Sequence, residues 1–378
     1  MIPPDPSHGS VNSARILELD GLRGIAVLMV VLWHYVGAII DPALGIWAGA
    51  LARTLILGRV GVDLFFVLSG FLITGIILDR TRSASHFLSS FYIRRTLRIL
   101  PPYLLLVSAF WLIVAAGVSN AEFSSETPLW RHLTFTQNLW MAEQGRWGPG
   151  AISVTWSVAI EEQFYLLFPP LMLLLARRHV PVVLLMLAAV SIAYRAFVYE
   201  GAATAFDAYV STPARLDALA LGGVLAWAWR ERQIRAWLES NRMLPCAVAG
   251  VGLVSIPALV VFMNRDLGWH MFYWGHTYLS IFFCAALASV LLTRNDWLGR
   301  ILRQRWLRFS GAISYSVYLF HPFILSCAFL LAARTESMRD LTDLAIVLVA
   351  FTATVLFCWL SANQIERPAM RIGRRFSY

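Results

Sequence analysis

An arginine and a histidine stand eleven residues apart in an otherwise apolar stretch, DGLRGIAVLMVVLWHYVG. Eleven residues turn an α-helix through about 1100°, so Arg23 and His34 share one face and are separated by about 16 Å along the axis. An arginine near a helix end is often an interfacial anchor, and a histidine in a span often bonds a neighbouring helix. Ionisable groups inside apolar helices are nevertheless functional candidates by default, and two on one face strengthen that interpretation.

The spacing of this pair suits a ligand that is anionic at one end and reactive at the other. Arginine binds phosphate through bidentate, charge-assisted hydrogen bonds. Histidine accepts a proton from a hydroxyl near neutral pH. A separation of about 16 Å is of the same order as an extended pantetheine arm. An acyl-coenzyme A could therefore rest its phosphates at Arg23 and extend its thioester to His34, which would act as a general base.

A second basic cluster lies in FYIRRTLRILPPYLL, just before an apolar run. Arg95 and Arg98 are three residues apart and fall on one face of a helix start. Arginines at this place also fit simple membrane topology, which accounts for at least one of Arg94, Arg95 and Arg98. The functional interpretation is a phosphate cradle at the same mouth as Arg23.

Paired carboxylates stand in TWSVAIEEQFYLLFPP. We expect Ser157 to cap a helix whose early turns carry Glu161 and Glu162. The helix dipole favours carboxylates near a helix N-terminus, which is explanation enough for Glu162. Glu161 shares a face with Tyr165, and we expect it to orient His34 or to bind acceptor hydroxyls.

Two tyrosines and a histidine recur in SYSVYLFHPFIL. Tyr315, Tyr318 and His321 fall on adjacent turns of one helix, and Pro322 is expected to kink it. A polar stripe that lines a cavity and a packed aromatic face are equally compatible with this pattern.

The composition predicts that membrane-spanning helices position these residues. The chain of 378 residues is 58% hydrophobic and 14% charged, with a mean hydropathy of +0.65, whereas soluble domains carry about 25% charged residues. Apolar segments of about 20 residues, enough to span a bilayer, predict an all-α polytopic bundle that forms a single domain, 1–378. Ten spans are expected, at 24–40, 60–78, 100–118, 158–175, 181–198, 215–229, 245–263, 274–292, 310–333 and 342–361.

The arginines fix the expected orientation. The sequence contains no lysine, so all 31 basic residues are arginines. With the N-terminus inside and ten alternating spans, 21 arginines fall in cytoplasmic segments and seven in outer loops, as the positive-inside rule requires. Both termini are then cytoplasmic, with an N-terminal segment 1–19 and a basic tail 363–378. Topology and lipid headgroups thus explain most of the net charge of +9 without a nucleic-acid partner.

Cysteine spacing predicts no metal site. Each of the four cysteines falls in an expected span, at no metal-binding spacing, and reads as a small core residue. They are Cys246, Cys284, Cys327 and Cys358.

The motifs together resemble the acyltransferase 3 family of membrane acyltransferases. The resemblance rests on DGLRGIAVLMVVLWH, GVDLFFVLSGFLIT, FYIRRTLRILPPY, TWSVAIEEQFYLLFP, ISYSVYLFHPF and the terminal ERP, in the family's order from about 16 to 368. It implies transfer of an acyl group, often acetyl, from cytoplasmic acyl-coenzyme A to a hydroxyl of a cell-surface glycan, a lipid-linked sugar or a macrolide. It also implies an integral protein of the bacterial inner or cytoplasmic membrane.

Residue roles carry over from the resemblance position by position. It implies that His34 is catalytic and that Arg23, Arg95 and Arg98 face the coenzyme. The roles of the other matching positions stay open; these are Asp20, Ser69 and Glu161. We further expect a stand-alone form without the extracytoplasmic hydrolase-like domain that some relatives carry.

Two other classes of function compete with an enzyme. In a secondary transporter, Arg23, His34 and Glu161 would form an ion or proton path, although the paired repeats common in transporters are absent from the sequence. A non-catalytic scaffold would leave the intramembrane arginine and histidine without a reason. Release of free thiol from acyl-coenzyme A separates the enzyme from both.

Overall fold

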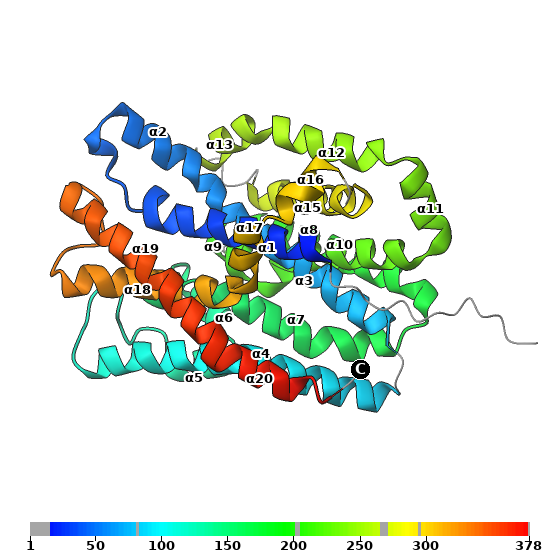
Figure 1. The fold of residues 1–378 in the computed structure, drawn as a ribbon, viewed down its shortest axis with the longest axis horizontal. Coiled ribbons are helices and arrows are strands. Elements are labelled where there is room, and N and C mark those ends of the chain that lie inside the picture. Colours follow the sequence, from blue (N-terminus) through cyan, green and yellow to red (C-terminus); the bar gives the residue numbers. More distant parts are fainter. Residues whose placement is uncertain (1–15, 81–82, 201–204, 265–270, 294–295, 377–378) are drawn as a thin grey trace, which may run out of the picture.

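The protein is a bundle of helices (Figure 1). The structure, a computed structural model, describes residues 16–80, 83–200, 205–264, 271–293 and 296–376. Over these residues it contains no strand, only an isolated bridge between Ile40 and Met338, so the expected all-α class is confirmed. Most of the N-terminal segment 1–19 lies outside the described residues.

The α-helices and shorter helical turns follow one another along the chain as follows: α1 (Leu17–Leu32), η1 (Trp33–Gly37), η2 (Pro42–Leu44), α2 (Ile46–Leu55), η3 (Ile56–Val60), α3 (Gly61–Leu78), α4 (Ala84–Ala115), α5 (Leu129–Leu133), α6 (Gln137–Gln144), η4 (Gly150–Ile152), α7 (Thr155–Leu173), η5 (Arg177–His179), α8 (Val180–Glu200), α9 (Ala205–Val210), α10 (Thr212–Arg230), α11 (Arg232–Ser240), α12 (Met243–Val254), α13 (Ile256–Asn264), η6 (Met271–Gly275), α15 (His276–Leu292), α16 (Trp297–Leu302), α17 (Arg305–Ala312), α18 (Ser314–Leu331), α19 (Leu341–Ser361), η7 (Ala362–Glu366) and α20 (Arg367–Gly373). In Figure 1, α4 and α20 lie along one edge of the bundle and α12 and α13 along the opposite edge.

Seven helical stretches in the described part of the chain are long and apolar enough to cross a membrane. The expected count of ten included three weaker segments. Those at 158–175 and 215–229 are continuous helices that carry charged or polar residues, and the one at 245–263 divides into α12 and α13. The number of spans and the cytoplasmic position of both termini therefore stay predictions.

The first helix begins earlier than its apolar run. It starts at Leu17 and carries Glu18 and Asp20 in its first turn, where the helix dipole stabilises negative charge. Arg23 is therefore the seventh residue of the helix, and its expected position at the cytoplasmic mouth stays a prediction. The expected helix start at Arg95 and Arg98 is wrong, since the 32 residues of α4 include the arginine cluster in mid-helix, because nothing between Ala84 and Arg98 breaks a helix.

Glycines bring α1 against α16 and α17 at backbone distance. A Cβ at Gly21 would lie 2.2 Å from the carbonyl oxygen of Leu302, and one at Gly311 would lie 1.8 Å from that of Asp20. Neither position has room for a side chain. This close packing fixes the part of α1 that presents Arg23.

Buried ion pairs join α3, α8, α10 and α15. Arg215 bonds Asp63 at 2.7 Å, and His276 lies 3.2 Å from the same carboxylate. Arg195 bonds Asp217 at 2.9 Å. All five side chains are buried, and removing one partner from such a pair is costly because it leaves an uncompensated charge. The two contacts to Asp63 hold α3, which forms a wall of the candidate site.

A π-helical turn carries His34. Residues Trp33–Gly37 form η1. A π-helical turn is rare in proteins, and where one occurs it is often at a functional site. The hydroxyl of the next residue, Tyr35, donates to the carbonyl oxygen of His321 at 2.9 Å and lies 2.7 Å from Thr354 Oγ1. The turn is thus fastened to α18 and α19.

One local expectation is wrong. Ser157 does not cap a helix, because α7 begins at Thr155; its hydroxyl bonds Val154 O and Tyr318 Oη instead. Pro322 lies inside α18, which runs from Ser314 to Leu331, and the expected kink there stays a prediction.

Candidate active site

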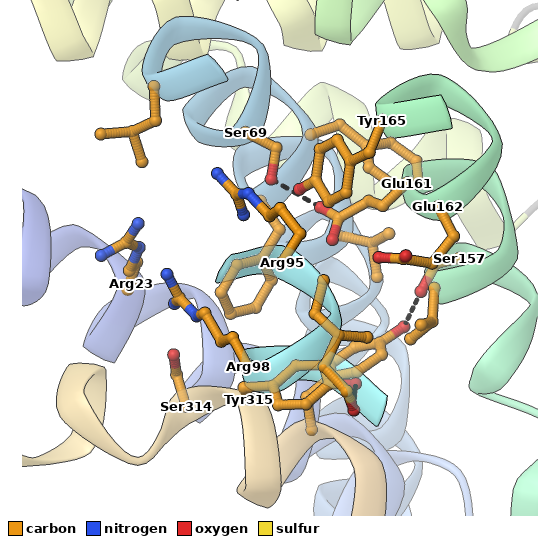
Figure 2. A pocket seen from close by; sticks show the side chains of 17 residues that line it. Arg23, Ser69, Arg95, Arg98, Ser157, Glu161, Glu162, Tyr165, Ser314 and Tyr315 are labelled. Carbon is orange, nitrogen blue, oxygen red and sulfur yellow. Dashed lines mark hydrogen bonds between the residues drawn. The ribbon is translucent and has the colours of Figure 1, made fainter. Parts of the chain in front are cut away.

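A pocket with about 780 Å³ of empty space, its open mouth included, lies among α1, α3, α4, α7 and α18. Figure 2 shows guanidinium groups toward one side of it and carboxylates toward the other. The lining residues are Arg23, Val62, Phe65, Phe66, Ser69, Leu72, Arg95, Arg98, Ile99, Ser157, Val158, Glu161, Glu162, Tyr165, Ser314, Tyr315 and Tyr318.

Three arginines from two helices share this pocket (Figure 2). Arg23 has a weak pair with Asp20, at 3.5 Å. Within the described part of the chain neither Arg95 nor Arg98 forms a salt bridge, and Arg98 repels both other guanidinium groups. Half-buried cations that lack a carboxylate partner are a natural site for an anionic ligand.

A serine, a glutamate and a tyrosine form the facing polar cluster. Ser69 Oγ donates to Glu161 Oε1 at 2.6 Å, and Tyr165 lies one turn beyond Glu161 on the same helix. The guanidinium carbon of Arg95 is 4.8 Å from the centre of the Tyr165 ring. The cluster is therefore linked to the arginines, and it offers both a hydroxyl and a proton acceptor to the pocket.

Aromatic side chains line part of the pocket. Tyr318 bonds Ser157 at 2.6 Å, and its ring centre is 5.9 Å from that of Phe65. Tyr315 donates to the carbonyl oxygen of Ile99 at 3.0 Å. Of the two interpretations of SYSVYLFHPFIL, the cavity lining holds for both tyrosines.

His34 does not line this pocket. Its ring packs edge-on against His321, with centres 4.8 Å apart, and the ring of His321 is 6.0 Å from that of Tyr318. The histidine pair therefore lies directly behind the aromatic end of the pocket. Glu161 Oε1 accepts a hydrogen bond from Ser69, and among the described residues no hydrogen bond joins Glu161 to His34; its other expected role, to bind acceptor hydroxyls, stays a prediction.

The remaining motif positions divide between the pocket and its supports. Asp20 is buried and pairs with Arg23. Arg94 does not line the pocket; its backbone lies against Gly373 of α20. Around α4, Arg98 stands between Arg94 and Arg95, about 40° from the first and about 60° from the second, so Arg95 is on the pocket side of Arg98 and Arg94 on the side toward α20.

Two acidic residues near the pocket were not expected there. The position of Glu162 was attributed to the helix dipole, but Glu162 lines the pocket. Glu366 accepts a hydrogen bond from Ser316 at 2.5 Å and attracts Arg98. Its signal was the terminal ERP, whose glutamate is buried although the segment around it is basic. Phe65 and Phe66 carried no signal, because apolar wall residues look like any others in a span.

A pair of glutamates lies in the loops beyond these helices. Ser326, on α18, donates to Glu336 at 2.8 Å and lies 3.4 Å from Glu122. Burial raises the pKa of both carboxyl groups, and the charge of Glu122 contributes to raising the pKa of Glu336 to about 7. No cluster of three or more His, Cys, Asp or Glu side chains suited to a metal occurs among residues that the structure describes.

Comparison with known proteins decides the family. The profile of a family described as an acyltransferase domain matches residues 16–363. The chain belongs to the acyltransferase 3 family. It is accordingly an integral membrane protein of the bacterial inner membrane.

Three relatives illustrate the family. A candidate peptidoglycan O-acetyltransferase of Bacillus subtilis is 28% identical over 393 residues, which cover 97% of this chain and 57% of that protein. A candidate O-acetyltransferase of Staphylococcus aureus is 26% identical over 371 residues, 94% of this chain and 57% of the other. The O-acetyltransferase OatA of Staphylococcus aureus is 24% identical over 366 residues, with the same coverage. This chain thus spans a little over half the length of these relatives, and no solved structure matches it significantly.

Proposed function

We propose that the protein is a membrane-embedded O-acyltransferase. It moves an acyl group, acetyl first among the candidates, from cytoplasmic acyl-coenzyme A to a hydroxyl of a sugar, glycan or macrolide-type acceptor. The observation that carries this proposal is the pocket in which Arg95 and Arg98, which form no salt bridge with any described residue, lie beside Arg23. The names of the relatives, which include a candidate peptidoglycan O-acetyltransferase, support acetyl as the group and a cell-wall glycan among the acceptors.

The donor lies along the pocket in this proposal. Its phosphates contact the three arginines, and its pantetheine arm follows α3. The pocket-lining positions Leu72 and Val62 are ten residues apart, about 15 Å along the helix axis. The thioester then reaches the apolar end formed by Phe65 and Tyr318, one ring away from the histidine pair.

The transfer step uses His34 as general base. Its free ring nitrogen takes the proton of the acceptor hydroxyl while the hydroxyl oxygen bonds the thioester carbonyl carbon. The carbon–sulfur bond then breaks, and the proton passes from His34 to the leaving sulfur, which departs as coenzyme A thiol. Proton transfer of this kind contributes typically 10²–10⁴-fold to a rate.

A specific observation supports a second route. The bond from Ser69 to Glu161 pairs a hydroxyl with a proton acceptor inside the donor pocket, as an acyl-serine intermediate would need. We favour direct transfer, because it requires a single base and no second encounter between acyl-enzyme and acceptor.

The test is thiol release by the purified protein. With acetyl-coenzyme A and a panel of glycan and macrolide acceptors, we expect free thiol together with an acceptor heavier by one acetyl group in the mass spectrum. A protein that leaves acetyl-coenzyme A intact with every acceptor, yet moves ions or protons across vesicles, would be the alternative secondary transporter that uses Arg23, His34 and Glu161 as its path.

A further inference from the structure

A second histidine contacts the proposed base. His321 Nε2 lies 3.2 Å from His34 Nδ1, and His321 is fully buried whereas His34 is half-buried. The two side chains come from α18 and η1, at positions 287 residues apart in the chain. The proposed transfer step gives His321 no role, so its place beside the base calls for a separate explanation.

The carbonyl oxygens around His321 fix its proton. Its Nδ1 lies 3.0 Å from Val317 O and 2.9 Å from Tyr318 O. Carbonyl oxygens only accept hydrogen bonds, so this nitrogen must carry a hydrogen. In a neutral imidazole the other nitrogen is then bare. His321 therefore presents a lone pair at Nε2 to its neighbour.

The same reasoning fixes the proton of His34. Its Nδ1 lies 2.9 Å from Val30 O and 3.2 Å from the bare Nε2 of His321. Both neighbours are acceptors, so His34 Nδ1 must be the donor. A bare Nδ1 would instead face two sets of lone pairs. Neutral His34 consequently has its basic lone pair at Nε2.

We propose that His321 is the positioning residue of the catalytic histidine. It holds His34 in the tautomer whose Nε2 is bare, and it accepts the Nδ1 hydrogen bond that strengthens when His34 becomes an imidazolium. The inference rests on the proposed function, because it concerns the same base. Together with the main-chain oxygen of Val30, His321 provides the hydrogen-bond acceptors that the carboxylate provides in a Ser-His-Asp triad.

The surrounding structure keeps the two rings in register. Tyr35, the residue after His34, donates to the main-chain oxygen of His321 at 2.9 Å. The η1 turn and α18 are thus linked twice at one level. Arg59, on η3, repels a proton on His34, and no carboxylate among the described residues bonds either ring. A neutral acceptor is therefore the available partner for the positive charge that His34 takes up.

A double-mutant cycle tests this role. Four proteins are compared in the thiol-release assay with acetyl-coenzyme A and acceptor: wild type, His34→Ala, His321→Leu and the double variant. Losing a hydrogen bond to a charged group should lower kcat roughly ten- to a hundredfold in His321→Leu, with KM for acetyl-coenzyme A unchanged. In the His34→Ala background the same substitution should change kcat by less than about twofold, because there is no imidazolium left to stabilise.

A fifth protein, His321→Gln, separates chemistry from packing. Its amide oxygen can accept the His34 hydrogen bond, so this variant should recover most of the kcat that His321→Leu loses. It also keeps the test valid if His321→Leu fails to fold. Equal losses in both backgrounds, wild-type kcat in His321→Leu, or no recovery in a folded His321→Gln would each overturn the inference. Full activity in His34→Ala would instead overturn the proposed base.

Discussion

Replacing Arg95 and Arg98 together by alanine removes two cations from a pocket wall in which neither forms a salt bridge with a carboxylate of the described residues. If they bind coenzyme A phosphates, each loses a charge-assisted hydrogen bond, which costs about 1.5–3 kcal/mol. That corresponds to roughly ten- to a hundredfold in affinity for one contact. The two residues are neighbours, so their effects should not add fully. We therefore expect the dissociation constant of coenzyme A in the double variant to rise by more than one such contact gives and by less than the product of two, on the order of a hundredfold.

Stability should respond in the opposite sense. Arg98 lies close enough to Arg23 and Arg95 to repel both, and no described carboxylate pairs with Arg95 or Arg98. Removing both should therefore leave the unliganded protein as stable as wild type or slightly more so. A purely structural pair of arginines would give a lower melting temperature instead.

The assay is calorimetric titration of coenzyme A into detergent-solubilised protein at low and at physiological salt. Arg94→Ala is the matched control, because Arg94 stands beside Arg95 on α4 but does not line the pocket. Wild-type affinity should weaken with salt, and that dependence should shrink in the double variant. An unchanged dissociation constant in the double variant, or an equal loss in Arg94→Ala, would refute a phosphate role for the pair.

Four further outcomes are expected. His34→Ala should keep coenzyme A affinity near wild type and lower turnover by about 10²–10⁴, as measured by thiol release. Ser69→Ala should retain substantial activity; an acylated enzyme that forms with donor alone and disappears with acceptor, seen by intact mass, would show a covalent route instead. A cysteine in place of the exposed Ser89 should be labelled from the cytoplasmic side in an accessibility experiment, and outside labelling would contradict the orientation. Because the pKa of Glu336 rises from 4.5 to about 7 on folding, the folded protein keeps a proton that the unfolded chain releases between these values, so the melting temperature should fall as pH rises through this window and Glu336→Gln should flatten the slope.

The sequence was sufficient for the fold class and for most of the polar side chains that line the pocket. Arg23, Arg95, Arg98, Ser69, Glu161, Tyr165 and Tyr315 all line it. Helical periodicity is the reason, because residues three or four apart share a face whatever the neighbouring helices do. Hydropathy failed at helix ends, since an amphipathic or charged turn continues a helix without being apolar. That is why the α4 arginines lie deeper in their helix than expected.

Contacts between distant helices could not be predicted in the same way. The segment DGLRG suggested an arginine near a membrane surface. It gave no sign that Gly21 lies against the backbone of Leu302 on α16, where a side chain would not fit. Glu161 was expected to orient His34 or to bind acceptor hydroxyls, but its distance from that histidine depends on how α7 packs against α3. Nothing in either segment encodes that packing, and the structure gives Glu161 to Ser69 instead.

The separation of His34 from the pocket has a mechanistic consequence. A base within the donor pocket would activate water as readily as an acceptor and would waste the thioester by hydrolysis. Here Tyr318 lines the pocket, its ring centre lies 6.0 Å from that of His321, and its hydroxyl bonds Ser157. In the proposed mechanism a donor thioester meets His34 when the Tyr318 ring moves aside. The arrangement therefore favours transfer over hydrolysis, provided that acceptor binding promotes this movement.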